Sequence, residues 1–478
     1  MAMRGTNGGM KLVKAALAGG VALATLAVPV VAQAQSRPDQ QAFFGLYKEL
    51  VETNTTLSSG SCTQAAAQIG ARMKAAGYAD SDITYFSVPD HPKDGGLVAV
   101  LPGTDKKLKP MLLLGHLDVV EAKREDWVRD PFTLIEENGY YYGRGTMDDK
   151  AQAAVWADSM IRFKKDGYKP KRTIKLALTC GEETTFAWNG AQWLAQNKPD
   201  LIAAEFALNE GGGGRYDASG KRQLLAMQVG EKASQNYTFL ASNPGGHSSQ
   251  PVPKNAIYEL ADAIKAVQGY EFPVKFTDTT RAFFTATAAA TGGAIGGAIT
   301  RLLANPLDTE ADALISRDKA MHSTLRTTCV TTILTAGHAE NALPQRATAN
   351  VNCRIFPGET VEQTRLKLQE LAGPLVTVTA NAPVRPTAIP TKLDPKIMDP
   401  ARKLAAKHFP GVPLLPLMST GATDGIFLQA IGIPVYGAPG IFIDPDGNGT
   451  HGLNERLKIE SIYAGRDYLF DLVKLYAG

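Results

Sequence analysis

Short apolar runs alternate with segments of helical period through the first half of the chain. The runs at 110–114, 172–179 and 205–208 are typical of buried strands, and the period of the segments at 149–165 and 186–196 is typical of helices. Strands that alternate with helices in this way predict an α/β layer built on a mainly parallel sheet.

A second pattern occupies residues 231–382. It contains a predicted strand at 236–242 and two predicted helices at 255–267 and 361–371. A β-hairpin is predicted from two strands at 325–335 and 346–356. This order predicts a small α+β domain. Within it, residues 285–300 are rich in alanine and glycine, which leaves two interpretations: an insertion of unassigned structure or a buried helix.

The α/β pattern returns after residue 383. Helices are predicted at 396–408, 424–430 and 459–476, and a strand at 433–437. We therefore expect the small domain to be inserted into the large one. The expected divisions are 1–34, 35–230, 231–382 and 383–478.

The first 34 residues are typical of a secretory signal peptide. Arg4, Lys11 and Lys14 form a basic start, an apolar run follows from 15 to 31, and Ala32-Gln33-Ala34 is a small-x-small cleavage site. A membrane anchor is the alternative, but glycines and a proline interrupt the run. The sequence thus predicts an exported protein, periplasmic or secreted, without stable membrane association.

The charges of the remaining chain are balanced. The full chain has 50 basic and 47 acidic residues, and the excess equals the three basic residues of the leader. A balanced chain offers no electrostatic basis for binding nucleic acid or an anionic membrane.

Four cysteines are present, and export permits disulfides. Cys329 and Cys353 are equidistant from the centre of the predicted hairpin near Asn341, so that they would lie opposite each other at a separation that suits a disulfide. Two separate buried thiols are the other interpretation. The spacing of Cys62 and Cys180 predicts no pairing.

Potential metal ligands follow the predicted strands of the large domain. His116, the pair Glu182-Glu183 and Glu210 each come just after a strand, and Asp148 lies in the turn that opens a helix. In open α/β sheets ligands collect at the carboxyl edge of the strands. Imidazole and carboxylate groups bind zinc, and a two-metal site needs one carboxylate that can bridge.

Seven motifs occur in order along the chain. They are GHLDVV at 115–120, YGRGTMDDK at 142–150, EE at 182–183, GHSSQP at 246–251, NALP at 341–344 with RIFPG at 354–358, GATD at 421–424 and HGLNER at 451–456. Together they resemble the family of di-zinc metallopeptidases that includes aminoacylases, carnosinases and glutamate carboxypeptidases. The resemblance implies a zinc-peptidase-like catalytic domain with an inserted lid and dimerisation domain.

The resemblance also implies roles for individual residues. His116 and His451 would each bind one Zn²⁺, with Co²⁺ or Mn²⁺ as possible substitutes. Asp148 would bridge both ions, and the peptide bond between Asp148 and Asp149 would be cis. Glu183 would be a further ligand. Asp118 would orient the His116 ring, and Glu182 would be the general base that activates the metal-bridging water.

Residues of the expected lid complete this set. His247 would reach the site of a second subunit and stabilise the oxyanion, which implies a homodimer. Arg354 would pair with the free carboxylate of the substrate, and Asn341 would assist it. The alternatives are a plain loop histidine for His247 and a charge on a sheet edge for Arg354. Asp424 is expected to be a helix cap with a supporting role rather than a zinc ligand. Glu455 would either orient the loop of His451 or be exposed.

The fifth ligand position departs from the family pattern. Alignment favours Asn209, whereas chemistry favours the carboxylate of Glu210, and adjacent strand residues point to opposite faces. Both remain candidates.

Three hypotheses for function follow. The first is zinc-dependent hydrolysis of peptides with a free carboxylate, of carboxypeptidase or dipeptidase type. The second is hydrolysis of N-acyl amino acids, with a fatty acyl group favoured if 285–300 forms an apolar wall. The third is a non-catalytic periplasmic binding protein, which predicts the loss of Glu182 or of several ligands.

Overall fold

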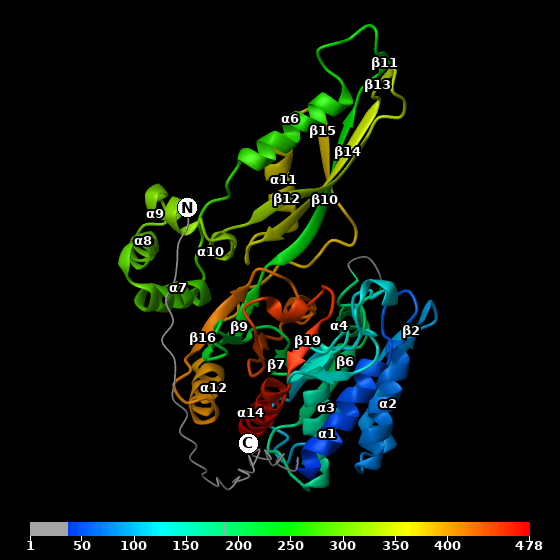
Figure 1. Ribbon diagram of the computed structural model, residues 1–478, viewed down its shortest axis with the longest axis vertical. Helices are drawn as coiled ribbons and strands as arrows, with labels where there is room; N and C mark the ends of the chain where they lie inside the picture. Colours follow the sequence, from blue (N-terminus) through cyan, green and yellow to red (C-terminus); the bar gives the residue numbers. More distant parts are fainter. Residues whose placement is uncertain (1–36, 185–187) are drawn as a thin grey trace, which may run out of the picture.

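A ten-stranded mixed sheet forms the centre of the large domain (Figure 1). The computed structural model describes residues 37–184 and 188–478, so the predicted signal peptide lies outside the described residues. The strands, in sheet order, are β1 (Ile83–Val88), β2 (His91–Leu101), β6 (Ile174–Thr179), β3 (Met111–His116), β7 (Phe206–Asn209), β17 (Val435–Gly437), β9 (Arg222–Glu231), β8 (Gly213–Tyr216) and β18 (Phe442–Ile443), with β16 (Leu414–Ser419) beside β9.

The central strands β6, β3, β7 and β17 run parallel to one another. Antiparallel pairs flank them, since β2 pairs with β6 and β17 with β9 in that orientation. The expected α/β class with a mainly parallel sheet is confirmed. A separate three-stranded sheet contains β4 (Ile135–Glu137), β5 (Tyr140–Tyr142) and β19 (Arg456–Lys458).

Helices cover both faces of the large sheet, which explains the continuous apolar runs. In β3, Met111 and Leu113 pack into one core and Leu112 and Leu114 into the other. The helices of the large domain are α1 (Pro38–Glu52), α2 (Cys62–Ala75), α3 (Lys150–Lys165), α4 (Gly190–Asn197), α5 (Pro199–Ile202), α12 (Pro395–His408), α13 (Gly425–Ala430) and α14 (Ile459–Ala477).

The predicted helix at 186–196 begins later than expected. Residues 185–187 lie outside the description, and Trp188 and Asn189 are not helical. The Asn189 side chain accepts a hydrogen bond from the Gln192 amide, so α4 starts at Gly190. A capping side chain locates the start of a helix more closely than the spacing of apolar residues does.

The small domain contains a four-stranded antiparallel sheet. Its strands, in order, are β12 (Thr328–Ala336), β14 (Arg346–Ile355), β10 (Ala233–Ser242) and β15 (Val376–Ala380), and α6 (Ala256–Gly269) and α11 (Val361–Ala372) pack against it. Alternate residues of β10 are buried, as expected for a sheet that is covered on one face. Two short strands, β11 (Gly246–His247) and β13 (Ala342–Leu343), pair at the end of the domain that points away from the large sheet (Figure 1).

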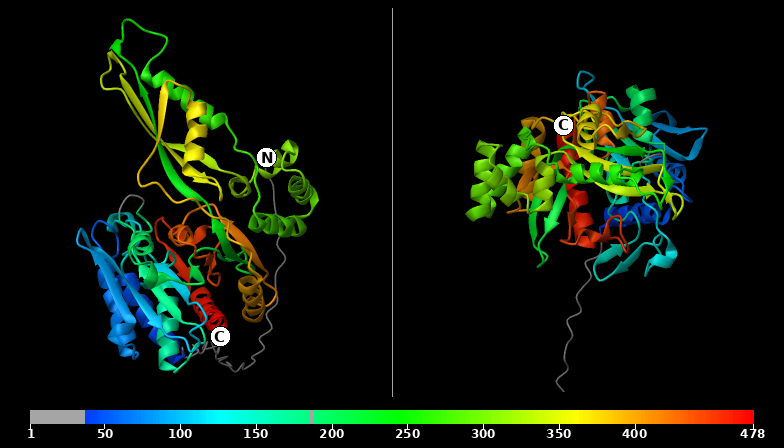
Figure 2. Two further views of the ribbon diagram at one scale, coloured as in Figure 1. Left: turned by 180° about the vertical axis from the view of Figure 1, so that it is seen from behind. Right: turned by 90° about the horizontal axis from the view of Figure 1, so that it is seen from above.

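The alanine- and glycine-rich segment is helical. It belongs to a cluster of four helices, α7 (Asp278–Thr291), α8 (Gly293–Ala304), α9 (Thr309–Ile315) and α10 (Lys319–Leu325). These helices enclose a core of their own around Phe284, Ile299 and Leu302. The cluster lies beside β16 in both side views (Figures 1 and 2).

Both pairs of cysteines form disulfides. Cys329 and Cys353 are opposite each other in the β12–β14 pair and are bonded, so the hairpin prediction is confirmed. Cys62 and Cys180, which the sequence left unpaired, form the second disulfide across 118 residues. Among the helices that the structure describes, none has both the length and the apolar character needed to cross a membrane.

Candidate metal centre

Five strands and loops bring the potential ligands to one edge of the sheet. His116 ends β3, the pair Glu182-Glu183 follows β6, and Glu210 follows β7. Because β3, β6 and β7 are parallel, their carboxyl ends meet. Asp148 comes from the loop before α3 and His451 from the loop before β19, two segments that are distant in sequence.

The side chains form two groups that share Asp148. The Nε2 atom of His116 lies 3.3 Å from Asp148 Oδ1 and 3.8 Å from Glu210 Oε1. On the other side, His451 Nε2 lies 3.1 Å from Asp148 Oδ2 and 2.9 Å from Glu183 Oε1. Each oxygen of Asp148 therefore faces a different imidazole, which is the arrangement that a bridging carboxylate needs.

These separations suit tetrahedral zinc. Bonds of about 2.0–2.2 Å to nitrogen and oxygen place tetrahedral ligand atoms about 3.3 Å apart. The ligand atoms of His116, Asp148 and Glu183 lie within 4.8 Å of one another, and so do those of His116, Glu182 and Glu210. The donor set is wholly imidazole and carboxylate, which zinc and other borderline divalent ions accept.

Buried negative charge is the second observation that fits cations. Burial raises the pKa of Glu210 to about 7, and burial also raises the pKa of Glu182 well above its ordinary value. One buried oxygen of Glu210 has no hydrogen-bond donor among the described residues. Carboxyl groups in this state bind protons unless cations compensate their charge, so two divalent ions would occupy positions that the protein leaves electrostatically unsatisfied.

The structure separates Asn209 from Glu210. The Asn209 amide is buried and donates a hydrogen bond of 3.1 Å to the Thr423 hydroxyl. The Glu210 carboxylate instead approaches His116. Adjacent residues at a strand end point in opposite directions, so only Glu210 faces the candidate ligands.

Asp118 lies between His116 and the pair Glu182-Glu183. Its carboxylate oxygen Oδ1 is 3.5 Å from His116 Nδ1, and its Oδ2 accepts a hydrogen bond of 2.9 Å from the Glu183 amide. His116 Nδ1 also lies 3.1 Å from the Asp118 carbonyl oxygen. Both contacts orient the ring so that Nε2 faces Asp148, as a positioning partner does.

Glu455 is an important residue whose role the sequence left open between orienting a loop and exposure. It is completely buried, and its carboxylate accepts hydrogen bonds from the Arg144 guanidinium and from three backbone amides, those of Gly145, Met147 and Asp148. Glu455 therefore ties the His451 loop to the loop that presents Asp148. The peptide bond between Asp148 and Asp149 is cis, and the Asp149 carboxylate accepts a hydrogen bond from the His116 backbone amide.

Asp424 does not cap a helix, although a supporting role was expected of it. It precedes α13, but its side chain makes no capping hydrogen bond. Instead it accepts hydrogen bonds from the Asn189 side chain at 2.6 Å and from the Thr179 hydroxyl at 3.0 Å. Thr179 ends β6, so Asp424 supports the turn that carries Glu182. The expected cap was wrong because these partners come from segments that lie far away in sequence.

A cavity of about 290 Å³ opens beside these groups. Its walls include Glu182, Glu183 and His451 from the large domain and Arg354 from β14 of the small domain. Arg385, in the return segment between the domains, also lines the cavity, and no motif had indicated it. Phe427 and Ile426 contribute an apolar wall. A larger cavity of about 600 Å³ lies between residues 389–395 and 429–436 and contains none of the candidate ligands.

Two predicted site residues lie elsewhere. His247 and Asn341 are exposed at the β11–β13 end of the small domain, where the Ser248 amide donates to the Asn341 carbonyl oxygen. Neither lines the cavity beside the metal groups. Within one chain, the structure thus brings together Asp118, Glu182, Arg354 and the candidate ligands His116, Asp148, Glu183, Glu210 and His451, but not this pair.

The α/β fold and the paired acid–histidine groups define a class of protein, the dinuclear metallohydrolases. The profile of the Peptidase family M20/M25/M40 matches residues 112–475, and the chain belongs to this family. Solved members of the family include a metallo-carboxypeptidase and a dinuclear metal-binding peptidase. The protein is therefore a metallohydrolase, and a purely binding role is not retained.

Known proteins resemble the chain over most of its length. The human N-fatty-acyl-amino acid synthase/hydrolase is 29% identical over 387 residues, which are 78% of this chain and 75% of that protein. The fold matches the M20 family metallo-carboxypeptidase of Sulfolobus solfataricus with a TM-score of 0.69 at 19% identity, over 92% of this chain and all of that one. It also matches a dinuclear metal binding peptidase of the M20 family from Bacillus subtilis, with a TM-score of 0.54 at 12% identity over 91% and 98% of the two chains.

Proposed function

We propose that the protein hydrolyses an amide bond in peptides that carry a free carboxylate, as a carboxypeptidase or dipeptidase with two zinc ions. The observation that carries the proposal is the shared cavity of Glu182 and Arg354, next to two groups of side chains that meet at Asp148. An acid near the metals and a guanidinium a short distance away match the reacting bond and the charged end of one small substrate.

The ligand sets follow from the two groups of side chains. His116, Asp148 and Glu210 would hold one ion, and Asp148, Glu183 and His451 the other. When bound, the ions supply Lewis acidity that polarises the amide carbonyl. Co²⁺ or Mn²⁺ would be accepted by the same donors.

Glu182 acts as the general base. Its carboxylate lines the cavity and is not one of the five ligand residues assigned above. It can therefore take a proton from the attacking water. The same carboxyl group then delivers that proton to the amine nitrogen as the C–N bond breaks. Asp118 keeps the His116 ring and the Glu183 amide in place throughout.

Arg354 recognises the substrate carboxylate. It is partly buried on β14, and its guanidinium offers the paired donors that match a carboxylate. Because it belongs to the small domain, binding a carboxylate would connect the two domains around the substrate. His247 and Asn341 would complete the site of the other subunit in a homodimer, as the family resemblance implies.

Hydrolysis of N-acyl amino acids is the second candidate. The observation in its favour is the human relative, whose name describes an N-fatty-acyl-amino acid synthase/hydrolase. The same carboxylate site would serve such a substrate. Helices α7 and α8, in the alanine- and glycine-rich segment, contribute no residue to the cavity, so that they offer no support for an apolar wall around a fatty acyl chain.

Export is part of the proposal. The basic start, apolar run and Ala32-Gln33-Ala34 site support a leader that is cleaved before Gln35, and two disulfides agree with an oxidising compartment. The mature protein would act in the periplasm or outside the cell.

The test is a substrate panel with the mature chain, loaded with zinc. Dipeptides, longer peptides and N-acyl amino acids are offered with a free and with an amidated C-terminus, to the wild type and to Glu182→Gln. We expect metal-dependent turnover of the free carboxylates only. We expect Glu182→Gln to lose activity by about 10²–10⁴-fold while it retains both zinc ions.

Preference within the panel decides between the two candidates. Faster cleavage of peptides supports the peptidase, and faster cleavage of N-acyl amino acids supports the second candidate. If Glu182→Gln turns over substrate as fast as the wild type, the role of Glu182 as the general base is refuted. A zinc-loaded wild type that hydrolyses no member of the panel would refute the proposed function.

A further inference from the structure

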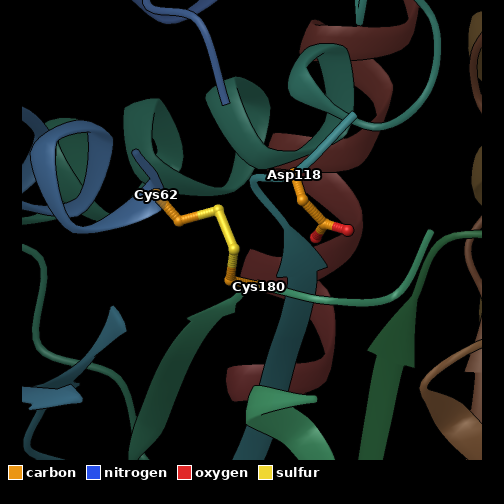
Figure 3. Close-up of side chains that lie close together, drawn as sticks. All are labelled: Cys62, Asp118 and Cys180. Carbon is orange, nitrogen blue, oxygen red and sulfur yellow. A yellow bond between two sulfur atoms is a disulfide. The ribbon is translucent and has the colours of Figure 1, made fainter. Parts of the chain in front are cut away.

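The Cys62–Cys180 disulfide lies directly behind the turn that carries the catalytic pair. Cys180 follows β6 and precedes Glu182 by two residues, while Cys62 is the first residue of α2. Both cysteines are buried. Figure 3 shows the Asp118 side chain beside this disulfide, and its carboxylate lies within 4.8 Å of both sulfur atoms.

The turn itself has no regular structure to hold it. Residues 181–184 belong to no helix or strand. Gly181 has a φ of +94°, and a Cβ atom there would lie 2.1 Å from the Trp188 carbonyl oxygen. The Glu183 amide donates a hydrogen bond to Asp118, the Gly181 carbonyl accepts from the Asn189 side chain and the Thr184 hydroxyl, and the Cys180 carbonyl accepts from the Gly190 amide. Hydrogen bonds, rather than a helix or strand, therefore hold the two carboxylates along residues 181–184.

The turn must present its carboxylates in one arrangement. The ligand oxygens of Glu182 and Glu210 lie within 4.8 Å of each other and of the His116 ring, and the Glu183 amide donates a hydrogen bond to Asp118. A covalent attachment to a rigid element reduces the number of other conformations that the turn can adopt before metals bind.

Helix α2 provides that rigid element. Its buried face, with Ala65, Ile69 and Met73, belongs to the main core of the large domain, and the helix packs against β2 and α3. The segment just before it also reaches the site, because the Thr55 hydroxyl donates to the Leu117 carbonyl oxygen. A bond from Cys62 therefore connects the catalytic turn to a part of the fold that does not depend on metal.

We propose that the Cys62–Cys180 disulfide is a positioning element, which holds Asp118, Glu182 and Glu183 in their metal-binding arrangement before the metals arrive. The proposal rests on the function proposed above for its effect on turnover, but its effect on metal affinity stands alone. A purely structural crosslink would change thermal stability without changing metal affinity or kcat at temperatures where the protein is folded.

The second disulfide offers a matched control. Cys62→Ala/Cys180→Ala removes the proposed positioning element, and Cys329→Ala/Cys353→Ala removes the crosslink between β12 and β14 of the small domain. The two crosslinks close segments of 118 and 24 residues, so their effects on melting temperature differ. All measurements are therefore made well below the melting transition of either variant.

Three quantities are measured for both variants and the wild type. They are the zinc dissociation constants, by competition with a chromophoric chelator, the kcat and KM values, and hydrogen–deuterium exchange of the metal-free protein. For Cys62→Ala/Cys180→Ala we expect zinc binding weaker by about 10-fold or more, a similar fall in kcat and a KM within about threefold. The amide of Glu183 should exchange faster. The control should match the wild type within about twofold.

The proposal is overturned if zinc affinity and exchange in Cys62→Ala/Cys180→Ala equal those of the wild type, or if the control loses as much. A wild type that binds two zinc ions but hydrolyses nothing would refute the function alone, since affinity and exchange would still judge the disulfide.

If the double variant does not fold, the control variant supplies a second route. Its only disulfide is Cys62–Cys180. Because both cysteines are buried, a trialkylphosphine is applied until thiol titration shows complete reduction and circular dichroism shows that the fold is retained. The phosphine and water become phosphine oxide, and the disulfide becomes two thiols. A phosphine is used because dithiols bind zinc. Reduction should weaken zinc binding by the same factor, and reoxidation should restore it; unchanged affinity after complete reduction would overturn the proposal.

Discussion

Two neighbouring residues at the end of β7 differ completely in what they contact. Asn209 is buried against Thr423, and Thr423 in turn donates to the Glu231 carboxylate at 2.8 Å. Glu210 points into the metal centre and approaches His116. At the scale of single residues, the direction of one strand end thus decides which side chain can be a ligand.

This difference gives the first prediction. Glu210→Gln should weaken zinc binding at one of the two positions by about 10-fold or more, because a neutral amide oxygen replaces a ligand carboxylate. Asn209→Ala should leave both zinc ions bound. Zinc titration of the metal-free variants measures both. The reverse order of effects would show that Asn209 is the ligand.

At the scale of elements, the loops that end at Asp148 and begin at His451 depend on one carboxylate. Glu455 connects them through Arg144 and three backbone amides, in a region with no exposure to solvent. A hydrogen bond to a buried charge is stronger than a neutral one, and removing its acceptor leaves the donors unsatisfied. Glu455 therefore supports the position of the two loops relative to each other.

The second prediction concerns this connection. Glu455→Ala should lower the free energy of unfolding by about 3–5 kcal/mol, since Arg144 becomes an unpaired buried charge. It should also weaken zinc binding, because Asp148 and His451 lose their common support. Denaturant unfolding and zinc titration test the two effects. Glu460→Ala, at an exposed glutamate on α14, is the control, and equal effects in both variants would contradict the prediction.

At the scale of the whole molecule, the two domains join at a buried lysine. Lys232 lies between the end of β9 and the start of β10 and has no exposed surface. Its ammonium group donates to the Ser323 hydroxyl at 3.2 Å. Burial and, to a smaller extent, the nearby cations Arg354 and Arg326 together lower the pKa of Lys232 to about 7.

The third prediction is a pH dependence. Because the folded pKa of Lys232 lies below the ordinary value of 10.5, the unfolded chain binds more protons between about pH 7 and pH 10.5. Folding stability contributed by this group therefore rises with pH across that window. Lys232→Met removes the contribution. The free energy of unfolding of the variant minus that of the wild type should therefore be about 1–3 kcal/mol larger at pH 7 than at pH 9.5.

The comparison uses denaturant unfolding at both pH values with the same zinc concentration, so that the pH dependence of metal binding enters both proteins alike. Lys265→Met, at an exposed lysine on α6, is the control and should show no such difference. A stability difference between Lys232→Met and the wild type that is the same at both pH values would contradict the prediction.

Much of this molecule follows from its sequence alone. Apolar period located the strands and helices because each pattern depends only on neighbouring residues, and α3, α12 and α14 agree with it to within a residue or two. The position of His116, Glu182 and Glu210 after parallel strands placed them at one edge before any contact was known. The Cys329–Cys353 bond followed from the symmetry of one hairpin.

Other features were decided only by the tertiary structure. Sequence could not choose between Asn209 and Glu210, pair Cys62 with Cys180, settle whether Glu455 is buried or place Arg385 in the cavity. It also assigned Asp424 to a helix cap, whereas its partners are Asn189 and Thr179. Each of these depends on contacts between segments separated by many residues. Local pattern carries no information about such contacts, and only the packed chain brings their partners within hydrogen-bonding distance.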